Sequence, residues 1–244
     1  MTAIVFDGEQ PRMTPHGPVI VGLVMHASEV EIVDTWHSLG MRGTDSNDVA
    51  ADGVFVPAAR SALITPVVEL RAPFAGPLYR VPAPASVDVV IAPVALAIAR
   101  GAITELRALA DRKTPIGAMK TLRHRAAVQS AVAEGEALLR SARLLFYDTL
   151  AATWRRAVDG EAATLEQKAD LMLASAHAVR TAAQVTDLMH RMSGTSGVYT
   201  RNRLERHFRD AQTVRHHGFL SESRLETVGQ VYLGVEPEFA MVAF

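Results

Sequence analysis

Residues 193–234 read SGTSGVYTRNRLERHFRDAQTVRHHGFLSESRLETVGQVYLG, the stretch of the chain that is densest in chemically capable side chains. The stretch holds a turn bracketed by Gly194 and Gly197, an arginine–aspartate pair at 209–210 and a histidine pair at 216–217. Glycine just after an apolar helical pattern is typical of a helix C-terminus. We therefore expect one helix to end at Gly194, another to begin near Asn202 with Glu205 in its first turn, and a last helix over 221–233.

Upstream of this stretch, the apolar pattern from residue 86 onward is helical. It predicts helices over 86–112, kinked near Pro93, over 122–158, and from a capping box of Thr164 and Gln167 to Gly194. The apolar positions of the second predicted helix recur at helical spacing: Val128, Val132, Leu139, Ala142, Phe146, Leu150 and Trp154. Long antiparallel helices with alanine-rich faces make an up-down bundle.

The N-terminal part has the pattern of strands. Short β-branched or apolar runs predict strands over 2–6, 19–25, 29–33 and 54–56, with a polar loop over 34–49. Five prolines over 66–85 argue against a helix or a central strand there. The expected fold class is α+β, mainly α. A partial antiparallel β-domain (1–65) is followed by a proline-rich linker (66–85) and an up-down four-helix bundle (86–244).

The composition is that of an ordinary globular chain. Its 244 residues can bury a core, the formal net charge of -1 gives no footprint for nucleic acid, and the absence of cysteine excludes disulfides and thiolate metal sites. No uninterrupted apolar stretch of membrane-spanning length is found, since the run 87–99 contains Asp88 and Pro93. We expect a cytoplasmic protein that binds neither nucleic acid nor membranes and has no metal site.

Three segments in order carry a resemblance to a family. DTWHSLGMRGTDSNDVAADGVFVPAAR (34–60) resembles the end of the β-domain in acyl-CoA dehydrogenases and related flavin monooxygenases. ADRKTPIGAMKTL (110–122) resembles the turn that opens the family's second long helix. SGTSGVYTRNRLERHFRDA (193–211) resembles its glycine turn and Arg-Asp helix. Each motif alone is weak, but together they are specific and cover nearly the whole chain.

The resemblance implies a bundle of the acyl-CoA dehydrogenase C-terminal type and FAD or FMN as the cofactor. It also implies that this sequence matches only the back half of the fold, without the N-terminal helical domain and the first β-domain strands. Accordingly, a homo-oligomer (dimer or tetramer), or a partner subunit that supplies the missing half, is expected.

The resemblance also names candidate cofactor-binding residues. Arg112 and Thr114 match positions that contact the flavin's pyrophosphate or adenine side across a subunit interface. Gly194 and Thr195 match the turn that lets a neighbour's cofactor approach the backbone, although Thr195 replaces a glycine and Arg191 replaces a glutamine. Ordinary helix-end chemistry remains an alternative at both places: cations favour a helix C-terminus, and Gly194 suits a C-cap.

The histidine pair carries the candidate catalytic residue. Acyl-CoA dehydrogenases place a glutamate base eight or nine residues after the matched Arg209, where this chain has His217 and Gly218. Flavin monooxygenases of the same fold place a histidine there, which deprotonates the substrate or hydrogen-bonds the flavin peroxide. Imidazole suits that role because its pKa lies near neutral pH. His216 is the adjacent candidate, and a surface histidine pair at a helix end is the structural alternative. The Arg209–Asp210 pair is expected to be structural.

Three functions remain open on the sequence. The first is a flavin-dependent oxidoreductase resembling the monooxygenases, with His217 as the base. The second is an acyl-CoA dehydrogenase-like oxidoreductase acting on a CH–CH bond, with its base on another helix. The third is a truncated or non-catalytic subunit that needs a partner for the missing half. Thr44, Ser46 and Arg42 lie in a loop near the flavin or substrate in the family, with turn chemistry as the alternative.

Overall fold

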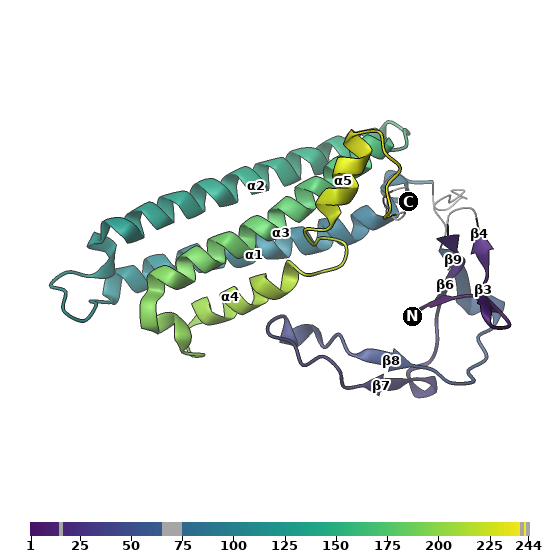
Figure 1. The fold of residues 1–244 in the computed structure, drawn as a ribbon, viewed down its shortest axis with the longest axis horizontal. Coiled ribbons are helices and arrows are strands. Elements are labelled where there is room, and N and C mark those ends of the chain that lie inside the picture. Colours follow the sequence, from purple (N-terminus) through teal and green to yellow (C-terminus); the bar gives the residue numbers. More distant parts are fainter. Residues whose placement is uncertain (15–16, 65–74, 240–241, 243–244) are drawn as a thin grey trace.

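The computed structural model describes residues 1–14, 17–64, 75–239 and 242, apart from the side chains of residues 83–86. The larger part of the described structure is a bundle of five helices, α1 (Ala83–Arg112), α2 (Ala126–Val158), α3 (Leu165–Ser193), α4 (Arg203–Val214) and α5 (Arg224–Tyr232). The three long helices lie alongside one another, α4 and α5 pack beside them, and the strands form a separate lobe (Figure 1). The predicted class, α+β and mainly α with an up-down bundle, is confirmed.

The bundle core lies between α1, α2 and α3 and is rich in alanine. Alanines of α1 and α3 are fully buried and allow the two helix backbones to approach closely, and Leu139 and Phe146 of α2 fill the space beside them. Gly101 of α1 lies under the ring of His207 from α4, where a β-carbon would overlap that ring. The short helix α4 is therefore held close to α1, and this contact positions the turns at both of its ends.

Helix α1 extends well beyond the apolar run 87–99 that it contains. Residues 87–112 are long and apolar enough, by length and composition, to cross a membrane. That evidence is weak, because the core helix of a bundle has the same character. Here the apolar face of α1 packs on α3 and α4.

Local helix signals are confirmed at three ends. Thr164 and Gln167 form the predicted capping box of α3, and Gly194 caps its C-terminus with φ 57°. Asn202 caps α4 by accepting a hydrogen bond from the Leu204 N–H, at 3.1 Å. Glu205 does not complete a capping box, because its carboxylate pairs with Arg209 instead.

The start of the second helix was predicted too early. A short 3-10 turn, η5 (Leu122–His124), occupies the predicted first residues, and α2 begins at Ala126. The final helix is likewise shorter than predicted, starting at Arg224 rather than 221.

The strand lobe contains four small antiparallel sheets. β1 (Thr2–Ile4), β6 (Ile20–Leu23) and β9 (Ser61–Ile64) form one sheet in the order β1-β6-β9. The others are the ribbons β2 (Phe6–Asp7) with β3 (Gln10–Pro11), β4 (Met13–Thr14) with β5 (Gly17–Pro18), and β7 (Glu31–Val33) with β8 (Asp48–Ala50). Of the described residues up to 64, only Gly40 is buried, so this lobe has no core of its own.

One strand prediction was wrong, and one strand of the main sheet was missed. Residues 54–56 are not a strand, and β9, which was not predicted, supplies the third strand of the main sheet. β8 also falls at the end of the segment predicted as a loop. Residues 66–74, nearly half of the proposed linker, lie outside the described residues. Its end holds a 3-10 turn, η4 (Pro77–Arg80), and α1 begins at Ala83 within it.

Candidate functional site

The turns at the ends of α1 and α3 meet through Lys113. Its ammonium group donates a hydrogen bond to the Ser193 carbonyl, at 2.7 Å, and lies beside Gly194. A cation at the C-terminus of α3 is also favoured by the negative end of the helix dipole. The structure thus brings the Arg112–Thr114 segment next to the Gly194–Thr195 segment, two motifs that lie about 80 residues apart.

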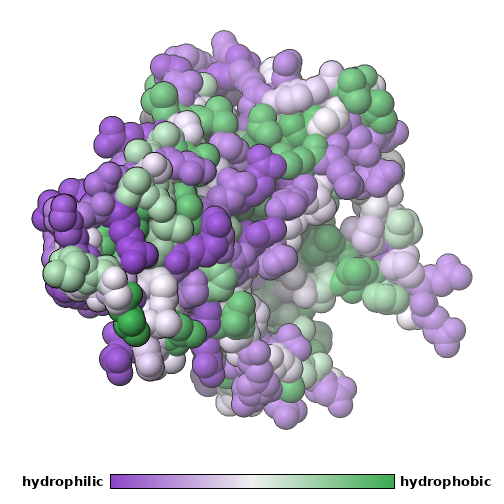
Figure 2. Space-filling model, turned by 60° about the vertical axis from the view of Figure 1, so that its left-hand side comes forward, coloured by the Kyte–Doolittle hydropathy of each residue, from purple (hydrophilic) through white to green (hydrophobic). Residues whose placement is uncertain are grey.

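A polar cavity of about 550 Å³ opens beside this junction. The α1 side contributes Arg112 with its neighbours Glu105 and Leu109, and the glycine turn and the start of α4 contribute the rest. Those further lining residues are Ser196, Tyr199, Arg201, Asn202 and Arg203. Three guanidinium groups against one carboxylate make the cavity attractive to an anion. The bundle end turned forward in Figure 2 is mostly hydrophilic, with separate hydrophobic patches.

Arg201 and Arg203 extend the site beyond the residues that the sequence singled out. The Arg201 guanidinium stacks over the Tyr199 ring, 4.3 Å from its centroid, and Arg203 lies 3.7 Å from the Glu105 carboxylate. The signal that could have found them is two arginines separated by one residue directly after a glycine turn. Neither pairing saturates a guanidinium group, so both retain donors for phosphate oxygens.

The other predicted cofactor residues lie near the cavity rather than in it. Thr114, Gly194 and Thr195 are exposed and do not line it. Thr114 precedes the start of α2 at Ala126 by twelve residues. Arg191 pairs with Asp187 at 2.9 Å, one turn earlier on α3.

His217 lies in the turn that follows α4. The His217 carbonyl accepts hydrogen bonds from the Leu220 and Ser221 N–H groups, both at 2.9 Å, so the turn folds back on the histidine. Leu220 is fully buried and anchors the turn in the core, whereas His216 and His217 are exposed. Protein atoms packed around the imidazole still disfavour its cation and lower the pKa of His217.

Phe219, two residues further along the turn, determines which ring nitrogen of His217 carries the proton. The Phe219 backbone N–H donates to His217 Nδ1, at 3.3 Å. A nitrogen that accepts a hydrogen bond carries no proton, so neutral His217 holds its proton on Nε2. In this conformation Nε2 is a hydrogen-bond donor. Only Nδ1 could accept a proton, and it already accepts the hydrogen bond from the Phe219 N–H.

The two groups of predicted residues lie at opposite ends of α4. The glycine turn precedes Arg203 and His217 follows Val214, so a twelve-residue helix, about 18 Å long, separates them. The structure therefore gathers Arg112, Thr114, Gly194 and Thr195 at one place but leaves His217 at another.

The loop with Gly40 and Met41 docks on α4 between those two ends. Asp210 accepts a hydrogen bond from the Met41 N–H at 2.6 Å, and Thr213 accepts one from the Gly40 N–H at 2.9 Å. Arg209 donates to the Leu39 carbonyl at 2.8 Å. The expected structural role of the Arg209–Asp210 pair fits these contacts, which join the strand lobe to the bundle.

The hydroxyls of that loop are used within it. Thr44 donates to the Met41 carbonyl at 2.9 Å and contacts the Ser46 hydroxyl at 2.9 Å. These bonds match the turn chemistry that was the alternative to a flavin contact.

Other histidines have structural partners in the described part of the chain. His190 contacts the Gly197 carbonyl at 3.0 Å and stacks on Phe208, which holds the glycine turn against α4. No group of three metal-ligating side chains is present among the described residues, and His16 lies outside them.

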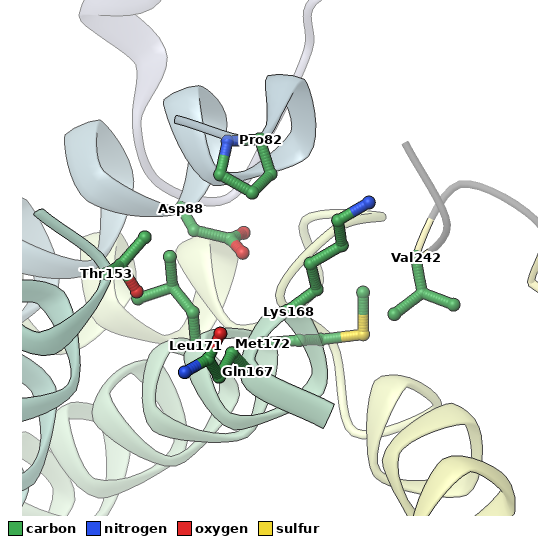
Figure 3. Close-up of a pocket in the computed structure, with 8 residues that line it drawn as sticks. All are labelled: Pro82, Asp88, Thr153, Gln167, Lys168, Leu171, Met172 and Val242. Carbon is green, nitrogen blue, oxygen red and sulfur yellow. The ribbon is translucent and has the colours of Figure 1, made fainter. Parts of the chain in front are cut away.

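A second, smaller cavity lies at the far end of the bundle, with room for about one water molecule. Figure 3 shows the Asp88 carboxylate pointing into it, with Lys168 across from it and Leu171 and Met172 from α3 alongside. Asp88 is 3% exposed, and its Oδ1 has no hydrogen-bond partner among the described residues. Burial raises the pKa of Asp88 to about 7. In the sequence, Asp88 stands out only as a charge that interrupts an apolar run.

Known proteins resemble this chain over most of its length. The indole-3-acetate monooxygenases of Acinetobacter baumannii and Pseudomonas putida are 30% and 31% identical to it over 88% of its residues. The oxygenase component of an FADH(2)-dependent resorcinol hydroxylase from a Rhizobium species is 26% identical over 93%. These matches cover 54% of each monooxygenase and 59% of the hydroxylase, so the chain spans little more than half the length of these relatives.

Solved structures share the fold. The 3-HSA hydroxylase of a Rhodococcus species superposes with a TM-score of 0.84 at 22% identity, covering 98% of this chain and 61% of its own. XiaF from a Streptomyces species, solved with FADH2 and glycerol, gives a TM-score of 0.81 at 24% identity, covering 93% of this chain and 59% of its own. The family described as "Acyl-CoA dehydrogenase, C-terminal domain" matches residues 89–222, from α1 through the His217 turn. With more than half of its residues inside that match, the chain belongs to the acyl-CoA dehydrogenase C-terminal domain family.

Proposed function

We propose that this chain forms the C-terminal part of a flavin-dependent monooxygenase, with FAD or FMN as its cofactor. The observation that carries the proposal is His217 in the turn after α4, at the place where the dehydrogenases of the resembling family have a carboxylate base. The identity to two indole-3-acetate monooxygenases supports this reading over acyl-CoA oxidation.

The arginine-lined cavity fits the phosphate end of such a cofactor. Arg112 and Arg201 have donors available for phosphate oxygens, and the Lys113–Ser193 hydrogen bond keeps Thr114 and Gly194 close by. Because His217 is a helix length away, we propose that the cavity and the histidine serve different flavin molecules, one of them held largely by another copy of the chain.

His217 then acts on the substrate. When bound, reduced flavin supplies the activation of oxygen for insertion into an aromatic substrate. The Nε2–H of His217 donates a hydrogen bond to a substrate oxygen and holds that atom in place. Because the pKa of His217 is lowered, the neutral ring prevails at neutral pH, and turning that ring to free Nδ1 would let it accept a proton.

The strand lobe suggests that the active form contains more than one chain. Large apolar side chains are exposed on it, including Phe55 at 85% and Met13 at 62%. A lobe without buried apolar residues gains little stability of its own. We propose a homo-oligomer, or a partner subunit that carries the remaining part of the fold, as the assembly that covers this surface. We also propose that the chain divides into a β part (1–65), a linker (66–85) and a bundle (86–244), because the core lies in the bundle and the strand lobe has none of its own.

Flavin binding and oxygen consumption test the function. Oxidised and dithionite-reduced FAD and FMN would be titrated into the purified protein, and oxygen uptake would then be followed with reduced flavin and indole-3-acetate or a phenol as probe substrates. We expect flavin binding and substrate-dependent oxygen uptake. The proposal is contradicted if the protein shows neither flavin binding nor oxygen uptake, both when it is tested alone and when it is co-expressed with the N-terminal half of a relative. Bleaching of bound flavin by an acyl-CoA, without oxygen uptake, would favour the dehydrogenase alternative.

A matched pair of arginine variants tests the cavity. Arg112→Gln removes one charged donor from the lining, and we expect roughly tenfold or greater loss of flavin affinity, as for a charged hydrogen bond. Arg107→Gln removes the same charge from an exposed position on α1 outside the lining, and should leave the affinity near that of the wild type. Equal losses in both variants would refute a specific role of the cavity.

A further inference from the structure

The turn that carries His217 is connected to the end of the chain by a row of aromatic rings. The Phe219 ring centroid lies 6.1 Å from that of His217, and the Phe219 ring also meets the Phe239 ring edge-on, with centroids 5.9 Å apart and planes at 77°. Phe239 follows α5, in the C-terminal segment. Residues twenty-two positions apart thus form one continuous contact from the tail to the histidine.

Phe239 is also in contact with a cation. The Arg224 guanidinium lies 3.7 Å from the Phe239 ring centroid. Its Nε and Nη1 are buried and have no hydrogen-bond partner among the described residues, and burial lowers the pKa of Arg224. Nη2 of Arg224 donates to the Ser223 hydroxyl at 3.1 Å, and the guanidinium otherwise lies on the Phe239 ring, so Arg224 and Phe239 constrain each other.

The last described residue of the tail, Val242, also packs on the bundle. Val242 is buried against Ala169 and Met172 of α3 and Val228 of α5, and Phe239 packs at the edge of the same cluster. The described part of the tail therefore packs on the bundle, and Phe239 contacts the turn after α4.

From this chain of contacts we propose that Phe239, acting through Phe219, is a positioning residue that keeps His217 in its Nε2–H form. The Phe219 N–H reaches His217 Nδ1 at 3.3 Å, a long bond that a small shift of the turn would break. The ring contact with Phe239 opposes that shift. The catalytic meaning of the arrangement rests on the proposed function, but the arrangement itself does not.

Histidine ring signals in nitrogen-15 NMR test the proposal without flavin. Chemical shifts and couplings of the two ring nitrogens report which one carries the proton, and His217→Gln identifies the signals of that ring among the nine histidines. In the wild type we expect the Nε2–H pattern. In Phe239→Ala we expect a mixture of both tautomers, together with about fivefold faster hydrogen exchange of the Phe219 amide, as for loss of one hydrogen bond.

Three further variants separate positioning from general destabilisation. Phe239→Tyr keeps the ring and should restore the wild-type signals. Val228→Ala removes packing from the same cluster but keeps both phenylalanine rings, and should leave the His217 tautomer unchanged. If Phe239→Ala does not fold, Phe239→Leu keeps apolar volume but lacks the ring, and the same two readouts decide.

Unchanged His217 signals and unchanged Phe219 exchange in the folded Phe239 variant would overturn the proposal. So would a mixture of tautomers in the wild type itself, or equal changes in Phe239→Ala and Val228→Ala. A failure of flavin binding, in contrast, would remove the proposed function while leaving these measurements valid.

Discussion

Asp88 is the position where burial should be most visible in the stability of the protein. It lies on α1, 3% exposed, facing the small cavity with Leu171 and Met172, and its Oδ1 has no hydrogen-bond partner among the described residues (Figure 3). A carboxylate in such surroundings is poorly solvated, which raises its pKa from 3.8 to about 7. Replacing Asp88 with asparagine removes the charge while keeping the shape of the side chain.

The direction in which stability changes with pH follows from which state of the protein, folded or unfolded, keeps the Asp88 proton. Between pH 3.8 and about 7 the folded state keeps the Asp88 proton while the unfolded state has lost it, so stability falls as pH rises through this window and levels off above it. A shift of about 3 pKa units corresponds to about 4 kcal/mol at 1.36 kcal/mol per unit. About 1.5 kcal/mol of that is already lost at pH 5, so about 2 to 3 kcal/mol is lost between pH 5 and pH 8.

Urea unfolding at pH 5 and pH 8 measures this difference. We expect the stability gained by Asp88→Asn over the wild type to be about 2 to 3 kcal/mol larger at pH 8 than at pH 5. The histidines with lowered pKa, His177, His207 and His217, act in the opposite direction, but they are common to both proteins and cancel in the comparison. Asp148→Asn, an exposed change on α2, is the control and should show no such difference.

A pH-independent effect of Asp88→Asn would refute the reasoning. It would mean that Asp88 stays ionised in the folded protein, with a partner or solvent around its carboxylate. A loss of stability at both pH values would indicate that the carboxyl group makes a hydrogen bond that asparagine cannot replace.

Three other outcomes are expected. Gly40→Ala should cost about 1 to 3 kcal/mol and expose the 34–47 loop to limited proteolysis, because the added methyl group would overlap the Arg209 carbonyl; unchanged proteolysis contradicts the docking. Glu136→Gln should cost about 1 kcal/mol at pH 7, less in high salt, because it breaks the pair with Arg100 on α1 and the pair with Arg140. The Arg100 guanidinium lowers the pKa of Glu136 to about 2, so this loss should shrink as pH falls from about 4.5 toward 2 in urea titrations, and a constant loss would contradict it.

Much of the bundle could be predicted because helices are specified locally. Each backbone hydrogen bond of a helix closes within four residues, so the capping box at Thr164 and the glycine cap at 194 mark the ends of α3 without reference to the rest of the chain. The family resemblance rests on similar short motifs, and His217 was found by its distance from one of them. The missed start of α2 reflects the 3-10 turn over 122–124, which an apolar pattern does not separate from a helix.

Contacts between distant segments were decided only by the tertiary structure. The third strand of the main sheet, β9, pairs with β6 across some forty residues, and nothing in its own sequence marks its partner. Lys113 meets the Ser193 carbonyl, Arg201 joins Arg112 at one cavity, and Phe239 reaches the His217 turn only because the helices pack as they do. Residue type and spacing thus determined the helices, and the family resemblance of the short motifs pointed to the candidate histidine. The contact of Phe239 with Phe219 and the burial of Asp88 depend on groups that folding brings together, which local sequence does not encode.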